Sequence, residues 1–209
     1  MGRNRVIEEN FEFNNGENLG FNNLFSIPFK SVDLNHLDVK AIKEYCLLKA
    51  NGNINRSNEG GWHSDLFDLE SLDEALKPLC DNILDISKEF CNELGVKQVT
   101  HIQNMWCIVN KNGHYNREHI HPNSFFSGAF YPGDEYTEDC GNLRFLHPAF
   151  KEMQYDWDDT QEIFNEYNSL SMNIKPVRGM LMIFPSYLTH SVHINRSDKD
   201  RLVVSFNLK

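Results

Sequence analysis

Two histidines in this 209-residue chain have a spacing that metal chemistry can use. One residue separates His119 from His121, and in an extended strand residues i and i+2 point to the same face. Two imidazoles on one face can bind one metal ion, and a third ligand must then come from a distant part of the chain. We take His190 as the best candidate for that ligand. The candidate ligands of a metal site are therefore His119, His121 and His190.

The other histidines are expected to have ordinary structural roles, because histidine is a common surface residue. We interpret them as polar surface or hydrogen-bonded loop residues, with His193 facing solvent. This group also contains His36, His63, His101, His114 and His147. A single His-x-His pair is common by chance, so the metal interpretation depends on the sequence that follows it.

The elements that must position the histidines begin with an N-terminal support region. Residues 1–23 are polar and rich in Gly and Asn, and we expect a loose arm there. Residues 24–95 are expected to contain a strand over Leu24–Val32, which a proline places at a sheet edge or a bulge. Helical periodicity in the same region predicts helices over Asn35–Ala50 and Pro78–Leu94.

The character of the sequence changes after Gly95. Residues 96–209 contain short strand-like runs separated by turn residues, with one helix expected at Asp158–Asn168. The pattern indicates a single domain of α+β class, mainly β, in which helices pack on one side of an antiparallel sandwich or barrel. The predicted strands are Val99–Val109, Phe125–Tyr131, Leu143–Leu146, Met180–Phe184, Thr189–Ile194 and Leu202–Leu208.

Composition excludes several classes of protein. The chain has 20 Lys and Arg against 30 Asp and Glu, a net charge of −10, which disfavours binding to a nucleic-acid backbone. No apolar run approaches the ~18 residues of a membrane span, and no secretory signal is visible. The five cysteines include no C-x-x-C pair, so we expect reduced thiols and a cytoplasmic location. An oligomer is compatible with the sequence.

A fixed order of motifs follows the histidine pair. His119–Tyr131 reads H-x-H-P-N-x-x-x-S-G-x-x-Y, and Gly179–His190 reads G-x-L-x-x-F-P-S-x-x-x-H. This order resembles the 2-oxoglutarate- and Fe(II)-dependent dioxygenases, in particular a small subfamily that carries these motifs. The resemblance is strongest over Trp106–Asn207. It implies a double-stranded β-helix (jelly roll) with N-terminal supporting helices.

The resemblance also implies Fe(II) on three protein ligands, with open positions for 2-oxoglutarate and O2. Most of the superfamily has Asp or Glu at the second ligand position, where this chain has His121. Either three histidines hold the iron, or His121 lies behind a carboxylate ligand such as Glu118 or Asp134. We favour three histidines, because the i, i+2 spacing gives His121 the correct face.

Arg201 is the expected partner of the distal carboxylate of 2-oxoglutarate, because a planar guanidinium can bind a carboxylate through two hydrogen bonds. The terminal strand should turn Arg201, Val203, Ser205 and Asn207 toward the site and the residues between them toward the core. A hairpin with a turn over residues 195–200 would pair His190 with Ser205. By resemblance, Tyr131, Ser205 and Asn123 are further candidates for co-substrate binding. For Asn123, a turn role after Pro122 is an alternative.

The expected function is that of a non-haem Fe(II) and 2-oxoglutarate-dependent dioxygenase. The reaction would be the hydroxylation of a substrate such as a peptidyl side chain or a small metabolite. Two other readings stay open. One is a jelly-roll binding or structural protein without catalysis. The other is a cupin-like three-histidine dioxygenase that does not use 2-oxoglutarate.

Overall fold

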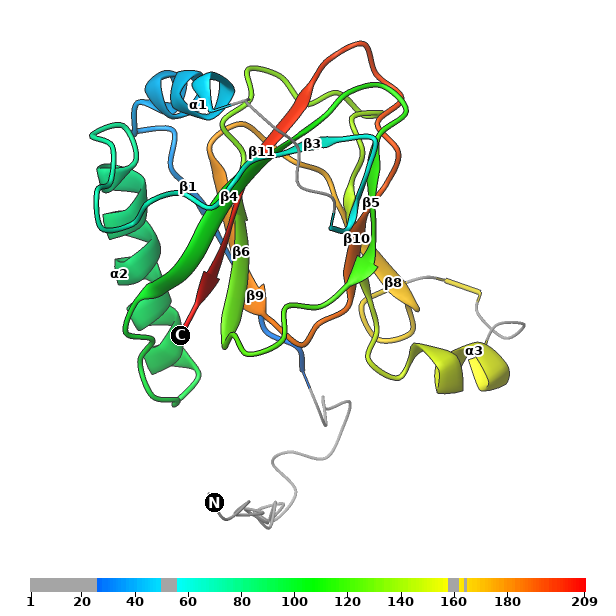
Figure 1. Cartoon of the computed structure of the whole chain (residues 1–209). Coiled ribbons are helices and arrows are strands. Elements are labelled where there is room, and N and C mark those ends of the chain that lie inside the picture. The colour runs from blue at the N-terminus through cyan, green and yellow to red at the C-terminus, as the bar shows by residue number, and fades with distance from the viewer. Residues whose placement is uncertain (1–25, 50–55, 158–161, 164) are drawn as a thin grey trace.

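Two antiparallel β-sheets face each other in the computed structural model, which describes residues 26–49, 56–157, 162–163 and 165–209 (Figure 1). The larger sheet has the order β1 (Lys30–Asp33), β9 (Met180–Pro185), β6 (Phe126–Phe130), β11 (Arg201–Leu208), β4 (Ile102–Asn110) and β3 (Trp62–His63). The smaller sheet has the order β2 (Asn58–Glu59), β5 (Tyr115–His119), β10 (His190–Val192), β7 (Leu143–Leu146) and β8 (Ser171–Ile174). The predicted mainly β fold is confirmed.

The helices α1 (Val39–Leu48) and α2 (Lys77–Glu93) lie beside the larger sheet, and α3 (Phe150–Trp157) lies near β8 at the other side (Figure 1). Asp38 caps α1, because its side chain accepts a hydrogen bond from the backbone N–H of Ala41 at 3.0 Å. Pro78 stands in the first turn of α2, as predicted, and Gly95 follows the helix with a φ of 66°. The buried sides of α1 and α2 form one core with the outer face of the larger sheet.

Strand β11 separates this outer core from the space between the sheets. Leu202, Val204, Phe206 and Leu208 belong to the core shared with the helices. The alternate residues, Arg201, Val203, Ser205 and Asn207, line a cavity between the sheets. The predicted alternation is confirmed, and it follows from the two-residue period of an extended strand.

The predicted hairpin between the last two strands is wrong. Strand β10 pairs with β5 and β7 in the smaller sheet, whereas β11 pairs with β4 and β6 in the larger one. Residues 193–200 therefore cross between the sheets. Asn195 is fully buried in this crossing, and its Nδ2 donates to the carbonyls of Asn110 and Lys199, both at 2.8 Å. These bonds satisfy two backbone acceptors and thereby stabilise the crossing.

Several boundaries differ from the sequence prediction. Strand β1 begins at Lys30 and lies at a sheet edge, as its proline indicated, and β2 and β3 add short strands from the region expected to be support. Helix α3 precedes the predicted Asp158–Asn168 helix, of which residues 158–161 and 164 lie outside the described residues. The expected arm at residues 1–23 also lies outside them. No described helix is long and apolar enough to cross a membrane. All five cysteines are buried and free.

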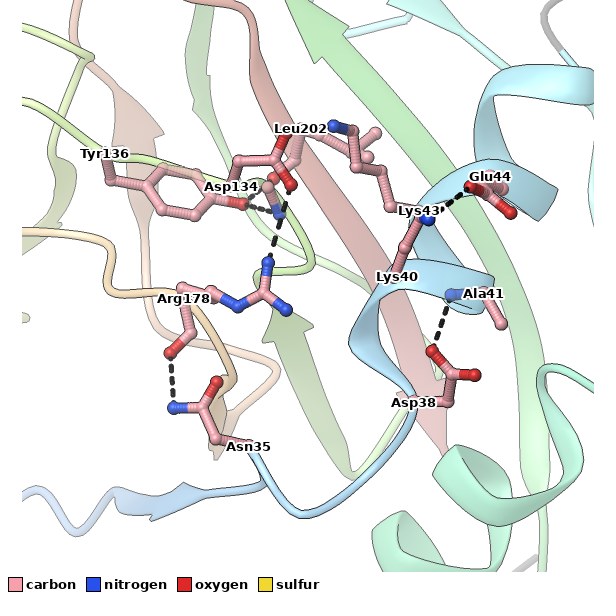
Figure 2. A network of polar contacts seen from close by, with 11 residues as sticks. Asn35, Asp38, Lys40, Ala41, Lys43, Glu44, Asp134, Tyr136, Arg178 and Leu202 are labelled. Carbon is pink, nitrogen blue, oxygen red and sulfur yellow. Dashed lines mark hydrogen bonds and ion pairs between the residues drawn. The ribbon is translucent and has the colours of Figure 1, made fainter.

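A network of charged side chains connects α1 to the loop after β6 (Figure 2). Asp134 forms ion pairs with Lys43 of α1 and with Arg178, and the backbone carbonyl of Arg178 accepts a hydrogen bond from Asn35 at 3.1 Å. In the same loop, the hydroxyl of Tyr136 donates to the carbonyl of Leu202 at 2.5 Å. The loop is thereby held against both the support helix and β11.

Candidate metal centre and co-substrate pocket

His119, His121 and His190 meet between the two sheets. His119 ends β5 and is the register partner of His190 at the start of β10, and their ring centroids lie 4.3 Å apart. The ring of His121 lies 5.0 Å from that of His119 and 5.1 Å from that of His190. One potential ligand atom from each residue lies within 4.8 Å of the others. The intervening Ile120 is 46% exposed, as the two-residue period requires.

Backbone carbonyls orient two of the three rings. Nδ1 of His119 donates to the carbonyl of Arg117 at 2.7 Å, and Nδ1 of His190 donates to that of Leu188 at 2.9 Å. A proton on Nδ1 leaves the lone pair of the neutral ring on Nε2, which is the atom available to a metal. Such hydrogen bonds behind ligating histidines fix the tautomer and the ring orientation.

The rings are poised in the neutral form that binds metal ions. Burial lowers the pKa of His190 to about 3 and that of His121 to about 4, and it also lowers the pKa of His119. The Nε2 atoms of His121 and His190 lie 3.2 Å apart. Metal–imidazole bonds of about 2.1 Å that meet at a right angle would separate two nitrogens by about 3.0 Å. The separation of this pair therefore suits binding to one ion.

The two carboxylates considered as alternative ligands lie in other interactions. Glu118 is exposed and forms an ion pair with Arg144 at 3.5 Å, whereas Asp134 belongs to the charged network around α1. Across the described ranges, His119, His121 and His190 are the one group of three potential ligands close enough for a metal. Nitrogen donors of this kind suit a divalent iron.

A cavity of about 640 Å³ contains the three histidines and extends to Arg201 and Tyr131. This volume lies within the range of small-molecule sites in proteins. The inner faces of both sheets line it, so residues far apart in sequence reach one space.

Arg201 is a buried cation with an unused donor. It is 1% exposed, and its Nε donates to the carbonyl of Gly141 at 2.8 Å. Its NH2 lies 3.4 Å from the hydroxyl of Tyr131, and its NH1 has no hydrogen-bond partner among the described residues. Within the described part of the chain no carboxylate forms an ion pair with it. Because a buried unpaired charge is costly, this end of the cavity fits the carboxylate of a bound anion.

Tyr131 is fully buried next to this guanidinium, with the Arg201 carbon Cζ 5.3 Å from its ring centroid. Burial raises the pKa of Tyr131, so its hydroxyl stays protonated. The oxygen accepts a hydrogen bond from Arg201, which leaves the phenolic proton for a ligand.

Of the other expected co-substrate residues, Ser205 lines the cavity but Asn123 does not. Asn123 is exposed and has a φ of 66°, which is the left-handed conformation that Asn tolerates in turns. The structure therefore gives Asn123 the turn role after Pro122 and does not bring it to the pocket.

Sequence reasoning missed two neighbours of the metal ligands. His63 is 3% exposed, lines the cavity and stacks on Trp106, with ring centroids 5.7 Å apart, so its expected surface or loop position is wrong. Trp106 in turn lies against His121 at 5.8 Å. The two-residue strand that carries His63 has too little periodicity to be recognised from sequence.

Comparison with known proteins agrees with this geometry. The profile of the family described as "Putative 2OG-Fe(II) oxygenase" matches residues 104–207, where 2OG is 2-oxoglutarate. That range contains the three histidines, Tyr131 and Arg201. No curated protein sequence matches the chain significantly.

Many solved structures share the fold. A prolyl-4-hydroxylase from Pseudomonas putida matches with a TM-score of 0.62 and 14% identity, over 88% of this chain and 93% of that one. A 2OG-Fe(II) oxygenase family oxidoreductase from Burkholderia pseudomallei matches with a TM-score of 0.55 and 15% identity, over 86% and 84%. A collagen prolyl hydroxylase from Paramecium Bursaria Chlorella virus-1, in complex with 2-oxoglutarate, matches with 0.54 and 14%, over 86% and 94%.

The two facing sheets are thus the double-stranded β-helix of these oxygenases. Family and fold together define the chain as an enzyme whose cofactors are Fe(II) and 2-oxoglutarate. The chain belongs to the 2OG-Fe(II) oxygenase family.

Proposed function

We propose that this enzyme is a 2-oxoglutarate-dependent hydroxylase in which His119, His121 and His190 hold the iron. Arg201 binds the distal carboxylate of 2-oxoglutarate. One observation carries the proposal. A single cavity joins three neutral imidazoles to a buried guanidinium that, within the residues that the structure describes, has a free donor and no acidic partner.

Bound Fe(II) supplies the activation of O2, with 2-oxoglutarate as the co-substrate that provides two electrons. The balanced reaction converts a substrate C–H bond, 2-oxoglutarate and O2 into a C–OH group, succinate and CO2. The protein orients the reactants. Nδ1 of His119 and of His190 donates to a backbone carbonyl, which would leave both Nε2 atoms to hold the ion.

Arg201 and Tyr131 hold the far end of the co-substrate. The free NH1 donates to one carboxylate oxygen, and the phenolic proton of Tyr131 is available to the other. Ser205 lines the same cavity, and its hydroxyl can bind co-substrate or water. The burial of Arg201 excludes solvent from the carboxylate, which strengthens the charge-assisted bonds.

Hydroxylation is the outcome named for two of the matched structures, both prolyl hydroxylases. We propose a peptidyl side chain or a small metabolite as the primary substrate, because a cavity of about 640 Å³ must accommodate the reacting group together with 2-oxoglutarate.

The test has two stages. Under anaerobic conditions, Fe(II) and 2-oxoglutarate should give a weak visible charge-transfer band. Admission of O2 should then release succinate and CO2. His190→Ala should abolish both signals, and the matched variant His193→Ala should keep them, because His193 is exposed and does not line the cavity.

Two outcomes would overturn the proposal. Iron binding without the band would indicate a three-histidine dioxygenase that does not use 2-oxoglutarate. Absence of both iron binding and the band would indicate a jelly-roll binding protein that lacks catalysis.

A further inference from the structure

Strand β4 contains a β-bulge opposite the C-terminal end of β11, whereas Arg201 begins that strand. Asn207 of β11 is opposite Asn104, but the next residue, Leu208, is opposite Ile102. Gln103 is therefore the extra residue of the bulged strand. A bulge breaks the alternation of a strand and redirects a side chain. Both Gln103 and Asn104 line the cavity as a result, although neighbours on a regular strand point to opposite faces.

A directional chain of hydrogen bonds holds the Asn104 side chain. Ser127 donates to Oδ1 of Asn207 at 2.7 Å, so its contact with Ser186 at 2.8 Å must use the proton of the Ser186 hydroxyl. Nδ2 of Asn207 then donates to Oδ1 of Asn104 at 2.7 Å. The chain uses the oxygen of Asn104 and leaves its amide NH2 group for the cavity.

Gln103 is held in the same sense by a separate contact. The hydroxyl of Ser124 donates to its Oε1 at 2.8 Å. Ser124 follows the metal-ligand segment by three residues, and the carbonyl of Ser186 accepts a hydrogen bond from the backbone N–H of His121 at 3.0 Å. Both amides are thus oriented by residues that adjoin the proposed metal site. Both residues line the same cavity, and their oxygens rather than their NH2 groups take part in these bonds.

The charged side chains that line the cavity lie outside this hydrogen-bonded group. Arg117 pairs with Glu59 at 2.9 Å, and Glu118 pairs with Arg144. Arg201 is at the Tyr131 end of the cavity, and the remaining charged lining residue, Arg56, is exposed. None of these takes part in the bonded group formed by Gln103, Asn104, Ser124, Ser127, Ser186 and Asn207.

We infer that Gln103 and Asn104 form a binding subsite for the primary substrate, and that the subsite takes an uncharged carboxamide or peptide group through its carbonyl oxygen. That the ligand is a substrate rests on the proposed function. The subsite itself is argued from the bulge and its hydrogen bonds. Neutral amide donors match a carbonyl acceptor, and no cation in the bonded group offers a carboxylate a partner. A charged group would lose hydration without gaining a counter-ion.

The experiment compares three small probes of similar size: neutral N-acetylglycinamide, anionic N-acetylglycine and cationic glycinamide. Each is titrated into the protein in the presence of Zn(II) and 2-oxoglutarate. The side-chain NH2 signals of Gln103 and Asn104 are followed by two-dimensional nitrogen–proton NMR. Variants Gln103→Glu and Asn104→Asp assign these signals by their loss. The neutral probe should shift both signals, with a half-saturating concentration at least fivefold below that of either charged probe.

The same two variants test the charge preference. A carboxylate in place of the NH2 group should weaken the binding of the neutral probe at least fivefold. Glycinamide should then bind more tightly than the other two probes. Asn173→Asp is the matched control, because Asn173 is an exposed amide on β8 outside the cavity, and it should leave the ranking unchanged. In Gln103→Glu and Asn104→Asp, binding is read from the remaining amide signal.

An equal response to the charged probes, no response of either signal, or an unchanged ranking in both variants would overturn the inference. These readouts need no turnover. Absence of the charge-transfer band of iron and 2-oxoglutarate, with an intact probe response, would reject the proposed function and retain the amide subsite. A normal band without a probe response would retain the proposed function and reject the subsite.

Discussion

His119 and His190 are register partners across the β5–β10 pair, with ring centroids 4.3 Å apart and each Nδ1 donating to a carbonyl of its own chain segment. Strand pairing therefore sets the separation of two proposed ligands before any metal binds. His121 lies beyond the strand end, where its backbone N–H bonds to the carbonyl of Ser186 at 3.0 Å. Substitution of His121 is therefore the most informative test of which residues bind the metal.

Replacement of His121 separates the two possible ligand sets. His121→Ala should weaken Fe(II) binding at least tenfold, because one of three donors is lost. His121→Asp should keep the Fe(II) dissociation constant within about tenfold of the native value, since a carboxylate oxygen also ligates iron in a two-histidine site. Anaerobic Fe(II) titration gives both values. Glu118→Gln is the control, and a loss of iron in that variant instead would assign the ligand to Glu118.

Arg201→Gln should raise the concentration of 2-oxoglutarate needed for half-saturation by about 100-fold, because a charge-assisted contact with a buried carboxylate is lost. The affinity for Fe(II) should change little. Titration of the charge-transfer band measures the first quantity and metal titration the second. Arg196→Gln, at an exposed arginine, should match the native protein in both. A native requirement for 2-oxoglutarate in Arg201→Gln would remove this residue from the co-substrate site.

Gly141→Ala should lower both thermal stability and co-substrate affinity. Gly141 has a φ of 91°, and an added Cβ would collide with the carbonyl oxygen of His193. The left-handed conformation alone costs a non-glycine residue about 1–2 kcal/mol. The collision would also displace the carbonyl that binds Nε of Arg201, and we expect an increase of about tenfold in the half-saturating concentration of 2-oxoglutarate.

The matched variant for this experiment is Gly113→Ala. Gly113 has a φ of 83° but open space where its Cβ would lie. It should therefore show the stability loss without the change in co-substrate affinity. Equal 2-oxoglutarate titrations for the two variants would contradict the proposed link between Gly141 and Arg201.

Tyr136→Phe tests the support behind the co-substrate pocket. The hydroxyl of Tyr136 donates to Leu202 and accepts from the backbone N–H of Gly133 at 2.7 Å, and its ring meets that of Tyr131 edge to face. Loss of the hydroxyl leaves two buried backbone groups unpaired, which should cost about 1–3 kcal/mol in the free energy of unfolding. Urea unfolding measures this change. Tyr187→Phe, at a tyrosine that is 63% exposed, should be neutral.

The parts of the fold that local pattern determines could be predicted from sequence. In β11 the inward and outward residues differ in polarity, so their alternation was readable, and Pro78 and Gly95 marked the ends of α2 within one or two residues. Short elements such as β3, with two residues, carry no period at all. Helix α3 itself was not predicted, and the predicted Asp158–Asn168 helix lies partly outside the described residues.

In the candidate site, too, local features could be predicted from sequence and non-local ones could not. The spacing of His119 and His121 indicated a shared face, and the family motif pointed to His190 and Arg201. The relation of β10 to β11 was not readable, because consecutive strands usually pair and here the chain crosses between sheets at Asn195. The cavity position of Gln103 was missed for a related reason. A bulge depends on the register of the partner strand, which is a non-local property.

The five buried thiols give this enzyme an internal reporter of unfolding. Thiolate is the species that alkylating reagents attack, and burial raises the pKa of Cys80 to about 12. Iodoacetamide should therefore spare the native chain and modify all five positions once the chain opens, so intact mass would count open molecules directly. For an oxygen-consuming catalyst, the same shielding keeps oxidisable sulfur away from stray products of uncoupled turnover.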